Sequence, residues 1–352
     1  MATVFGWDIG GVHIKLAVVK DGQLISVEQI PCTLWLGVEH LHDALQVTVA
    51  RYGQAAANAR HAVTMTGELA ENFASREDGV RTICKETCAI LGEDRTRFYS
   101  ACDGSHFVNS AVVSLTQHWP WIASANWHAS ATWAASQRAN ALLIDIGSTT
   151  TDIIPLVDGE VRAPGFTDAE RLARGGLVYS GVVRTSLMVM GEAPFAGVQH
   201  RLMAENFSTT ADIYRLTEEL HPDDDSYPAS DGRGKSAPEC RARIARMFGR
   251  DAAEAYEAEW DFLARYFRER QLQMFSEAIA QVLSAERLPT SAPFLAAGAG
   301  HFLVPELARR FGHPCETFAD LAPTDSEEQK RRAGVCAPAA AVGLLAATCE
   351  EW

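Results

Sequence analysis

Residues 8–22 read DIGGVHIKLAVVKDG, and residues 145–159 read DIGSTTTDIIPLVDG. Both segments begin with Asp-Ile-Gly and end with Asp-Gly, and they match without a gap. Each predicts a strand, a tight glycine turn, a second strand and an Asp-Gly hairpin turn. The amides of such a turn point into one hollow, and the adjoining carboxylate can hold a metal-bound phosphate. Two copies in one register therefore indicate a duplicated domain with a phosphate cleft between the halves.

Length and composition restrict the class of protein. The chain has 352 residues, of which 47% are hydrophobic and 22% charged, and its formal net charge is −14. This length favours two domains. The negative charge argues against nucleic acid or a membrane as partner, but it permits a phosphorylated small molecule accompanied by a divalent cation. A homo-oligomer is also compatible with the sequence.

The apolar runs, the first residues and the cysteines of the chain bear on its cellular location. Its apolar runs are shorter than a membrane span, and its first residues lead into a strand rather than a signal peptide. The eight cysteines include no C-x-x-C pair, so we expect reduced thiols and a cytoplasmic protein.

Strand and helix patterns alternate along the chain, which predicts an α/β fold. We expect a first domain over 1–138 and a second over 139–336. Within the second domain we expect a helical insertion over about 168–290, which includes a helix at 181–189. A small, apolar helix at about 337–352 is expected to pack back onto the first domain.

Asp8 and Asp145 each end an apolar strand and begin a glycine turn. We expect them to face each other across the cleft, where two carboxylates would need a cation or a proton between them. Mg²⁺ suits such a place because it accepts one or two carboxylates, waters and phosphate oxygens. The alternative is that each Asp only caps its own turn.

The turns themselves supply hydrogen-bond donors for a phosphate. Backbone amides, and hydroxyl groups in the second copy, are expected at Gly10, Gly11, Gly147, Ser148, Thr149 and Thr150. The hydroxyl-rich run could instead be an ordinary strand edge.

Lys15 and Asp152 occupy the same position in the two copies. Their opposite charges suggest that Lys15 neutralises phosphate while Asp152 accepts a proton or binds metal-bound water; together with Asp145 they are our candidate catalytic residues. Both could instead be surface residues of the hairpins.

Two further segments are candidates for ligand contact. Gly298, Ala299 and Gly300 follow an apolar strand and would let the backbone approach a ligand, or they could start a helix tightly. Asn126 lies in a polar and aromatic cluster with Trp127 that could equally belong to the core.

Residues 222–236 are rich in Asp, Pro, Ser and Gly and include GRGKS at 232–236. A Walker loop would need glycine at position 229, where the chain has Ala229, so we reject that interpretation. A plain solvated loop is the favoured interpretation, and a lid that brings Arg233 and Lys235 over a phosphate is the alternative.

The two Asp-x-Gly loops and the late Gly-Ala-Gly resemble the phosphate and nucleoside motifs of the actin–hexokinase–Hsp70 superfamily. Within it the chain resembles the hydantoinase A/oxoprolinase family, and it is similar to the short stand-alone branch linked to tetrahydromethanopterin-dependent one-carbon metabolism. The segments that carry this finer resemblance are 66–70, 122–127, 143–152, 205–212 and 231–235.

The resemblance implies two actin/hexokinase-like (ribonuclease H-like) domains. It also implies a transferase of methanofuran biosynthesis, which joins an aminomethyl-furanmethanol diphosphate to γ-glutamyltyramine through an ether bond and releases diphosphate. Mg²⁺ is the expected cofactor. An ATP-dependent small-molecule kinase or lactam hydrolase of the same fold is the alternative, and a nucleotide-responsive binding module without turnover is a third.

Overall fold

The computed structural model describes residues 3–102, 106–114, 117–350 and 352. The chain divides into two compact units. Unit 1 comprises Met1–Ala139, Asp158–Val161 and Phe318–Trp352, and unit 2 comprises Asn140–Val157 and Arg162–Thr317.

The return to unit 1 begins earlier than predicted, because residues 318–336 belong to it and not to the second domain. This segment hydrogen-bonds to the edge strand of unit 1. The Leu24 amide donates to the Pro323 carbonyl (2.8 Å), and the Val27 amide donates to Gln329 Oε1 (2.6 Å). Hydrogen bonds between residues so distant in sequence leave no local signal, which explains the misplaced boundary.

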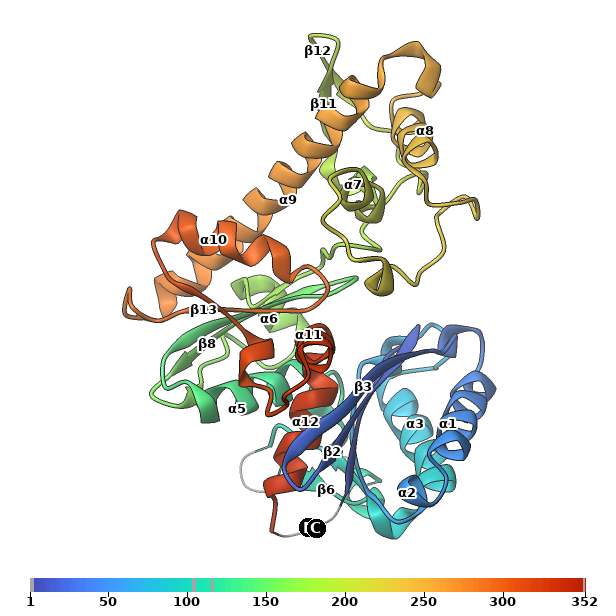
Figure 1. Cartoon of the computed structure of the whole chain (residues 1–352), viewed down its shortest axis with the longest axis vertical. Coiled ribbons are helices and arrows are strands. Elements are labelled where there is room, and N and C mark those ends of the chain that lie inside the picture. The colour runs from blue at the N-terminus through green and yellow to red at the C-terminus, as the bar shows by residue number, and fades with distance from the viewer. Residues whose placement is uncertain (1–2, 103–105, 115–116, 351) are drawn as a thin grey trace. The chain divides into compact units, whose positions relative to one another are not determined.

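Unit 1 is a sheet with helices on both faces (Figure 1). Its strands lie in the order β3-β2-β1-β4-β5-β6, with β2 antiparallel and β4 parallel to β1. The strands of this sheet are β1 Val4–Ile9, β2 His13–Lys20, β3 Gln23–Pro31, β4 Arg60–Met65, β5 Thr96–Tyr99 and β6 Phe107–Val108. The short strand β9 Glu160–Val161 also falls in unit 1 but is not part of this sheet. The helices are η1 Leu34–Leu36, α1 Val38–Tyr52, α2 Gln54–Ala57, η2 Gly67–Leu69, α3 Arg76–Leu91, η3 Glu93–Arg95, α4 Ser110–Val113, η4 Trp119–Trp121, α5 Asn126–Gln137, η9 Phe318–Leu321, α11 Glu327–Val335 and α12 Ala337–Thr348.

The small residues of α12 let this helix approach the central strand closely. A Cβ atom on Gly6 of β1 would lie 2.3 Å from the Ala339 carbonyl oxygen and 2.6 Å from the Gly343 nitrogen. The opposite face of β1 carries Trp7, which is fully buried with residues of α1 and α3. The expected packing of the C-terminal helix on the first domain is therefore found, and it needs glycine at position 6.

Unit 2 repeats the plan with the order β10-β8-β7-β13-β14, in which β8 is antiparallel and β13 parallel to β7. Its strands are β7 Ala141–Ile146, β8 Thr151–Val157, β10 Leu177–Val178, β11 Glu192–Phe195, β12 Val198–Arg201, β13 Phe294–Ala297 and β14 Cys315–Thr317. Its helices are α6 Asp168–Arg174, η5 Leu187–Met190, α7 Thr210–Leu216, η6 Pro222–Asp224, α8 Ala237–Met247, η7 Ala252–Glu254, α9 Glu257–Ala285, η8 His301–Leu303 and α10 Val304–Phe311.

The repeated sequence folds into the same hairpin twice. Asp21 and Gly22 have φ of 53° and 78°, and Asp158 and Gly159 have φ of 54° and 78°. Both residues of a type I′ turn need a positive φ, which Asp tolerates and Gly adopts freely. The predicted α/β fold of two duplicated, actin/hexokinase-like domains is confirmed.

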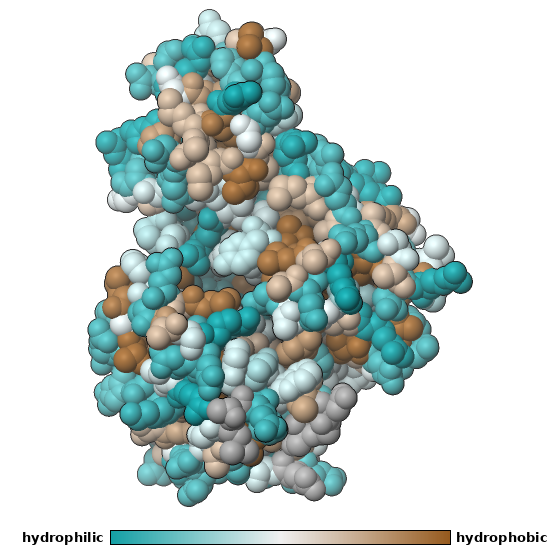
Figure 2. Space-filling view, turned by 180° about the vertical axis from the view of Figure 1, so that it is seen from behind, coloured by the Kyte–Doolittle hydropathy of each residue, from teal (hydrophilic) through white to brown (hydrophobic). Residues whose placement is uncertain are grey.

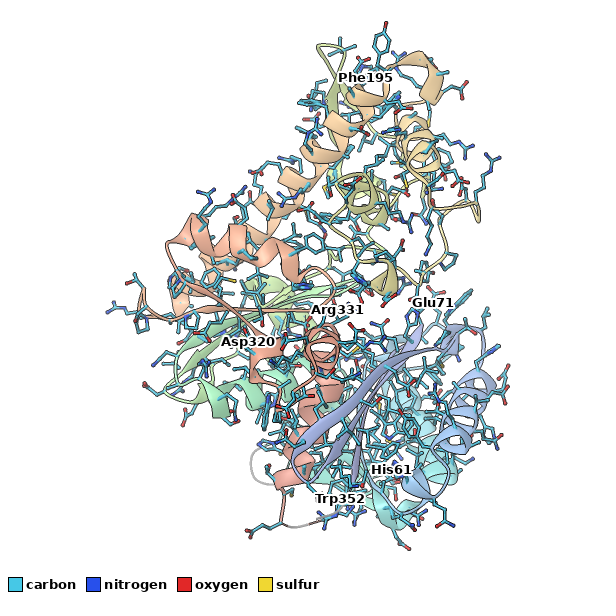
Figure 3. All side chains as sticks on the ribbon, in the orientation of Figure 1. His61, Glu71, Phe195, Asp320, Arg331 and Trp352 are labelled. Atoms are coloured by element: carbon cyan, nitrogen blue, oxygen red, sulfur yellow. The ribbon has the colours of Figure 1, made fainter. Side chains whose placement is uncertain are left out.

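The insertion in unit 2 is not helical throughout. The β11–β12 hairpin packs on α9, where the Phe195 and Trp260 rings stack with centroids 4.9 Å apart (Figure 3). This hairpin, α7, α8 and α9 share their own apolar core. The helix predicted at 181–189 is also not formed. The segment contains only the start of a short 3-10 turn, Leu187–Met190.

The surface is mixed in character. Figure 2 shows apolar residues scattered among hydrophilic ones on the face that it draws. Among the described residues, none of the helices is both long enough and apolar enough to span a membrane.

Candidate active site

The first glycine turn follows β1 in unit 1. The Gly10 amide donates to the His13 carbonyl (3.0 Å), and a Cβ on Gly10 would lie 2.9 Å from that oxygen. Gly11 is half-buried, with open space where a Cβ would stand. The turn is therefore tight at its base and open at Gly11, as a backbone site for phosphate requires.

Asp8 and Lys15 are neighbours across the β1–β2 pair. The Lys15 ammonium lies 3.3 Å from Asp8 Oδ2, and the Asp8 side chain is 4% exposed while that of Lys15 is 29% exposed. The buried carboxylate thus holds an ammonium that solvent, and therefore a ligand, can reach. This ion pair supports the phosphate role predicted for Lys15 and counts against Asp8 as a metal ligand.

The second turn follows β7 in unit 2 and has the same base. The Gly147 amide donates to the Thr150 carbonyl at 2.8 Å. Ser148 is exposed, and Thr149 and Thr150 are half-buried, so their hydroxyl groups remain near the surface. The hydroxyl-rich run is a turn between two strands rather than a strand edge, which keeps it available for a ligand.

A segment that the sequence did not single out supports this second turn. The Ser148 carbonyl accepts hydrogen bonds from the Val183 and Arg184 amides at 3.1 and 2.8 Å. A Cβ on Gly181 would lie 2.5 Å from the Gly147 carbonyl oxygen. These contacts hold residues 181–184 in a series of bends, and they are the physical reason why the helix predicted at 181–189 does not form.

Buried polar side chains hold the backbone of this supporting segment in place at Gly181. The Gln271 amide nitrogen donates to the Gly181 carbonyl (2.9 Å), and Thr210 Oγ1 donates to the same oxygen (2.8 Å). The Gly181 amide donates to Thr185 Oγ1 (2.8 Å). Gln271 is the residue from which the sequence could have indicated this support. A side-chain amide among the apolar residues of a long helix needs buried hydrogen-bond partners.

Gly298 lies directly against Asp145. Its φ is 80°, and a Cβ there would lie 2.4 Å from Asp145 Oδ1. The Gly300 amide donates to the Ile146 carbonyl (2.7 Å), and Ala299 is buried. Residues 298–300 therefore reach the second turn, and they also lead into the short helix η8. Their contact with a ligand stays a prediction.

Asp145 and Asp152 are paired in the β7–β8 register, so their side chains share one face of the sheet. Asp152 Oδ1 lies 2.5 Å from Arg171 Nη2 of α6, and Arg171 is 2% exposed. An ion pair with a buried guanidinium stabilises the charged carboxylate and weakens it as a base. The proton-accepting role of Asp152 stays a prediction, with this pairing against it.

Arg184 is a candidate that the sequence gave no reason to choose. Its guanidinium donates to Thr149 Oγ1 (3.3 Å) and lies 5.0 Å from the centre of the Tyr227 ring. Its side chain is exposed. It brings a positive charge to the second turn, where the sequence offered only carboxylates and hydroxyls.

Asn126 is half-buried and begins α5 in unit 1. The neighbouring Trp127 and Trp133 are 2% and 9% exposed, so the aromatic part of the cluster belongs to the core. His128 Nδ1 lies 2.8 Å from the Tyr99 hydroxyl. Of this cluster, Asn126 alone remains our ligand candidate.

Residues 222–236 are held by ion pairs. Arg243 is fully buried and binds Asp212 (2.7 Å) and Asp231 (3.1 Å). Asp225 binds Arg215 (2.7 Å) and Lys235 (3.2 Å). Residues 232–236 are all exposed, as the solvated-loop interpretation predicts, but these ion pairs also anchor the segment to α7 and α8.

These pairs also bear on the lid alternative. Lys235 is engaged with Asp225, whereas the Arg233 side chain is exposed and its amide donates to Asp231 Oδ1 (3.1 Å). Of the two cations, Arg233 is the one that could reach a ligand. A phosphate-covering role for this segment stays a prediction.

The two turns each combine backbone donors, a carboxylate and a cation: Asp8 and Lys15 in unit 1, Asp145 and Arg184 in unit 2. Such a set can bind a diphosphate, directly or with Mg²⁺. That the two turns face each other across one cleft, with Asp8 and Asp145 sharing the ion, stays a prediction.

The cysteines and the possible metal ligands of the chain can be considered together. Free thiols are present at Cys32, Cys84, Cys88, Cys102, Cys240 and Cys315. Among the described residues, His, Cys, Asp and Glu side chains form no group of three or more that could hold a metal ion. A cation site here would therefore depend on few protein carboxylates, with water and substrate oxygens completing it, as is usual for Mg²⁺.

The sequence of this chain is similar to curated proteins from two organisms. The chain is 28% identical over 279 residues to the (4-{4-[2-(gamma-L-glutamylamino)ethyl]phenoxymethyl}furan-2-yl)methanamine synthase of Methanocaldococcus jannaschii, covering 78% of this chain and 80% of that protein. It is 35% identical over 113 residues to the synthase of the same name from Methanococcus vannielii, covering 32% of this chain and 50% of that one.

A solved structure and a family model complete the comparison. The nucleotide-free structure of acetone carboxylase matches with a TM-score of 0.58 and 11% identity, covering 96% of this chain and 70% of that one, which shows a shared fold. The model of the hydantoinase/oxoprolinase family matches residues 60–319. This match includes the second turn, its supporting segment and residues 298–300. The chain belongs to the hydantoinase/oxoprolinase family.

Proposed function

We propose that this protein is a transferase of methanofuran biosynthesis. It would join an aminomethyl-furanmethanol diphosphate to γ-glutamyltyramine as an aryl ether and release diphosphate. The observation that carries the proposal is the 28% identity over 78% of the chain to a synthase whose name describes a phenoxymethyl-furan. The two glycine turns with their cations support it, because such a substrate is bound through its diphosphate.

The chain's own residues would bind the leaving group. In the first turn, the Gly11 amide and the Lys15 ammonium supply donors, and Asp8 positions Lys15. In the second turn, the hydroxyl groups of 148–150 and the Arg184 guanidinium do so. Donors aimed at the developing charge of a leaving diphosphate lower the barrier to its departure.

Mg²⁺ fits the donor set at the second turn. Asp145 is 9% exposed and touches Gly298, and the hydroxyl-bearing residues 148–150 begin three positions after it in the chain. Hard oxygen donors of this kind suit Mg²⁺, and we assign it to Asp145 rather than to the ion-paired Asp8. When bound, the ion would neutralise charge on the diphosphate.

The bond changes are simple. The phenol oxygen of the tyramine forms a bond to the furan methylene carbon, and the bond from that carbon to the diphosphate oxygen breaks. The diphosphate leaves with the electron pair, and the phenol proton passes to a base. A cytoplasmic location is part of the proposal and is supported by the free thiols.

The test uses purified protein, Mg²⁺ and both substrates, with ATP withheld. Mass spectrometry should detect the ether when the furan substrate carries its diphosphate, and none when the corresponding alcohol replaces it. Ether formed from the alcohol at the same rate, or no ether from either, would contradict the proposal.

A further inference from the structure

Glu68 is a buried carboxylate beside the first glycine turn. It lies in η2, directly after β4, and its side chain has no exposed surface. The preceding residues touch the turn: the Thr66 amide donates to the Ile9 carbonyl (2.9 Å), and a Cβ on Gly67 would lie 3.2 Å from that oxygen. The two residues just before Glu68 therefore contact the backbone at the base of the turn that we assign to the diphosphate.

Ser124 presents its hydroxyl group to this carboxylate. Ser124 Oγ donates to Glu68 Oε1 at 2.6 Å. The backbone of Ser124 is left-handed, with φ of 49°, two residues before α5. This conformation is costly for a residue with a Cβ, and such strain often accompanies a functional constraint.

Arg76 completes the group from α3. Its Nη2 donates to Ser124 Oγ (2.9 Å) and to Glu68 Oε1 (3.0 Å), and its side chain is 31% exposed. Ser124 Oγ therefore donates one hydrogen bond and accepts one, and a hydroxyl oxygen can accept a second. The exposed part of Arg76 shows that the group reaches the surface.

A second oxygen of the carboxylate stays unused. Within the described part of the chain, Glu68 Oε2 is buried and has no hydrogen-bond partner. A buried charge with an unsatisfied oxygen costs stability, so a purely structural role would favour a fully bonded side chain.

We propose that Glu68 is the proton acceptor for the phenol of the second substrate, acting through Ser124. This rests on the proposed function. The phenol donates to Ser124 Oγ, the Ser124 proton passes to Glu68, and the phenol proton replaces it on Ser124. As the phenol oxygen bonds to the methylene carbon, diphosphate leaves with the electron pair of the broken bond, and Glu68 ends protonated.

Segments 66–70 and 122–127, which carry part of the family resemblance, thereby gain one common role, since they meet at this hydrogen bond. Burial raises the pKa of Glu68, and the Ser124 hydrogen bond and Arg76 offset part of that rise. Arg76 of α3 and Ser124, which lies two residues before α5, are the groups that face the carboxylate.

The test compares wild type, Glu68→Gln, Ser124→Ala and Glu71→Gln with both substrates. Glu71 is an exposed carboxylate of the same segment and serves as the matched control (Figure 3). We expect kcat to fall by about 10²–10⁴-fold in Glu68→Gln, as for loss of a general base, and substantially in Ser124→Ala, with Glu71→Gln unchanged.

A second substrate separates proton transfer from structure. A ring-fluorinated γ-glutamyltyramine has a more acidic phenol and needs less help from a base. It should therefore recover most of the rate that Glu68→Gln loses, whereas a misfolded variant would gain nothing. Thermal unfolding of each variant checks the fold.

Three results would overturn the inference. Glu68→Gln and Ser124→Ala with wild-type kcat would do so, and so would folded variants whose loss the fluorinated phenol does not relieve. If wild type forms no ether at all, the proposed function itself fails and this inference falls with it. Wild-type activity in the same assay therefore tells the two failures apart.

Discussion

Asp152 Oδ1 lies 2.5 Å from Arg171 Nη2, and Arg171 also donates to the Gly176 carbonyl at 3.0 Å. Asp152 pairs in register with Asp145 across β7 and β8. A buried guanidinium thus stabilises the charge of Asp152 directly beside Asp145. We infer that this ion pair fixes the position of β8 next to the second glycine turn.

Arg171→Met should lower the free energy of unfolding by about 3–5 kcal/mol, because it removes the buried cation from Asp152. The double variant Arg171→Met with Asp152→Leu should regain much of that loss, since no charge then stays without its cation. Urea unfolding followed by circular dichroism measures both. Equal stability of the single and double variants would show that the ion pair carries no coupling.

Asp145→Asn should reduce turnover at least about a hundredfold and weaken its dependence on Mg²⁺ concentration, because the carboxylate charge is lost while the shape stays. Asp158→Asn is the matched control, since Asn tolerates the φ of 54° in the repeated turn. Initial rates of both variants and of wild type, measured across a Mg²⁺ titration, test this prediction. Near-normal activity of Asp145→Asn at low Mg²⁺ would remove Asp145 from the metal role.

Lys15→Ala should raise the KM for the furan diphosphate by about 10–100-fold, as expected for losing a charge-assisted contact of roughly 1.5–3 kcal/mol. The KM for γ-glutamyltyramine should change little. Lys20→Ala removes an exposed ammonium from the same strand and should leave both values unchanged. An unchanged KM for the diphosphate in Lys15→Ala would mean that this ammonium does not contact it.

His61 gives the fold a pH dependence. It is 1% exposed in β4, accepts from Trp7 Nε1 (3.2 Å) and lies 3.1 Å from the Ala56 carbonyl (Figure 3). Burial lowers the pKa of His61 to about 4 from 6.5. Between these values the unfolded chain binds more protons, so the stability due to neutral His61 is complete above pH 6.5 and is lost as pH falls toward 4.

This contribution amounts to roughly 3 kcal/mol. Unfolding free energies of wild type and His61→Gln, measured between pH 7 and 4, should differ in slope, with wild type losing more stability as the pH falls. Parallel curves would show that His61 does not titrate as its burial requires.

Local patterns in the sequence were enough to predict the fold class. The matched segments fixed both hairpins down to the positive φ of Asp21 and Asp158, because turn chemistry depends on adjacent residues. The positions of Gly298 and Lys15 also followed, since each stands at the end or in the register of a recognisable strand.

Long-range pairing was what the sequence concealed. Nothing local indicates that Arg171 binds Asp152, that Arg243 binds Asp212, or that Ser124 binds Glu68. For the same reason the sequence pattern predicts a helix at 181–189, whereas residues 181–184 form hydrogen bonds to the second turn. Charges and hydroxyls separated along the chain meet only after folding.

The most direct test of the central claim is a count of the phosphate species released per ether formed. Purified protein, Mg²⁺, the furan diphosphate and γ-glutamyltyramine are incubated with and without ATP, and diphosphate, phosphate and ADP are quantified beside the ether. We predict one diphosphate per ether without ATP, and added ATP should either have no effect or compete with the furan diphosphate. Ether that forms only with ATP, with ADP appearing in step, would contradict the account.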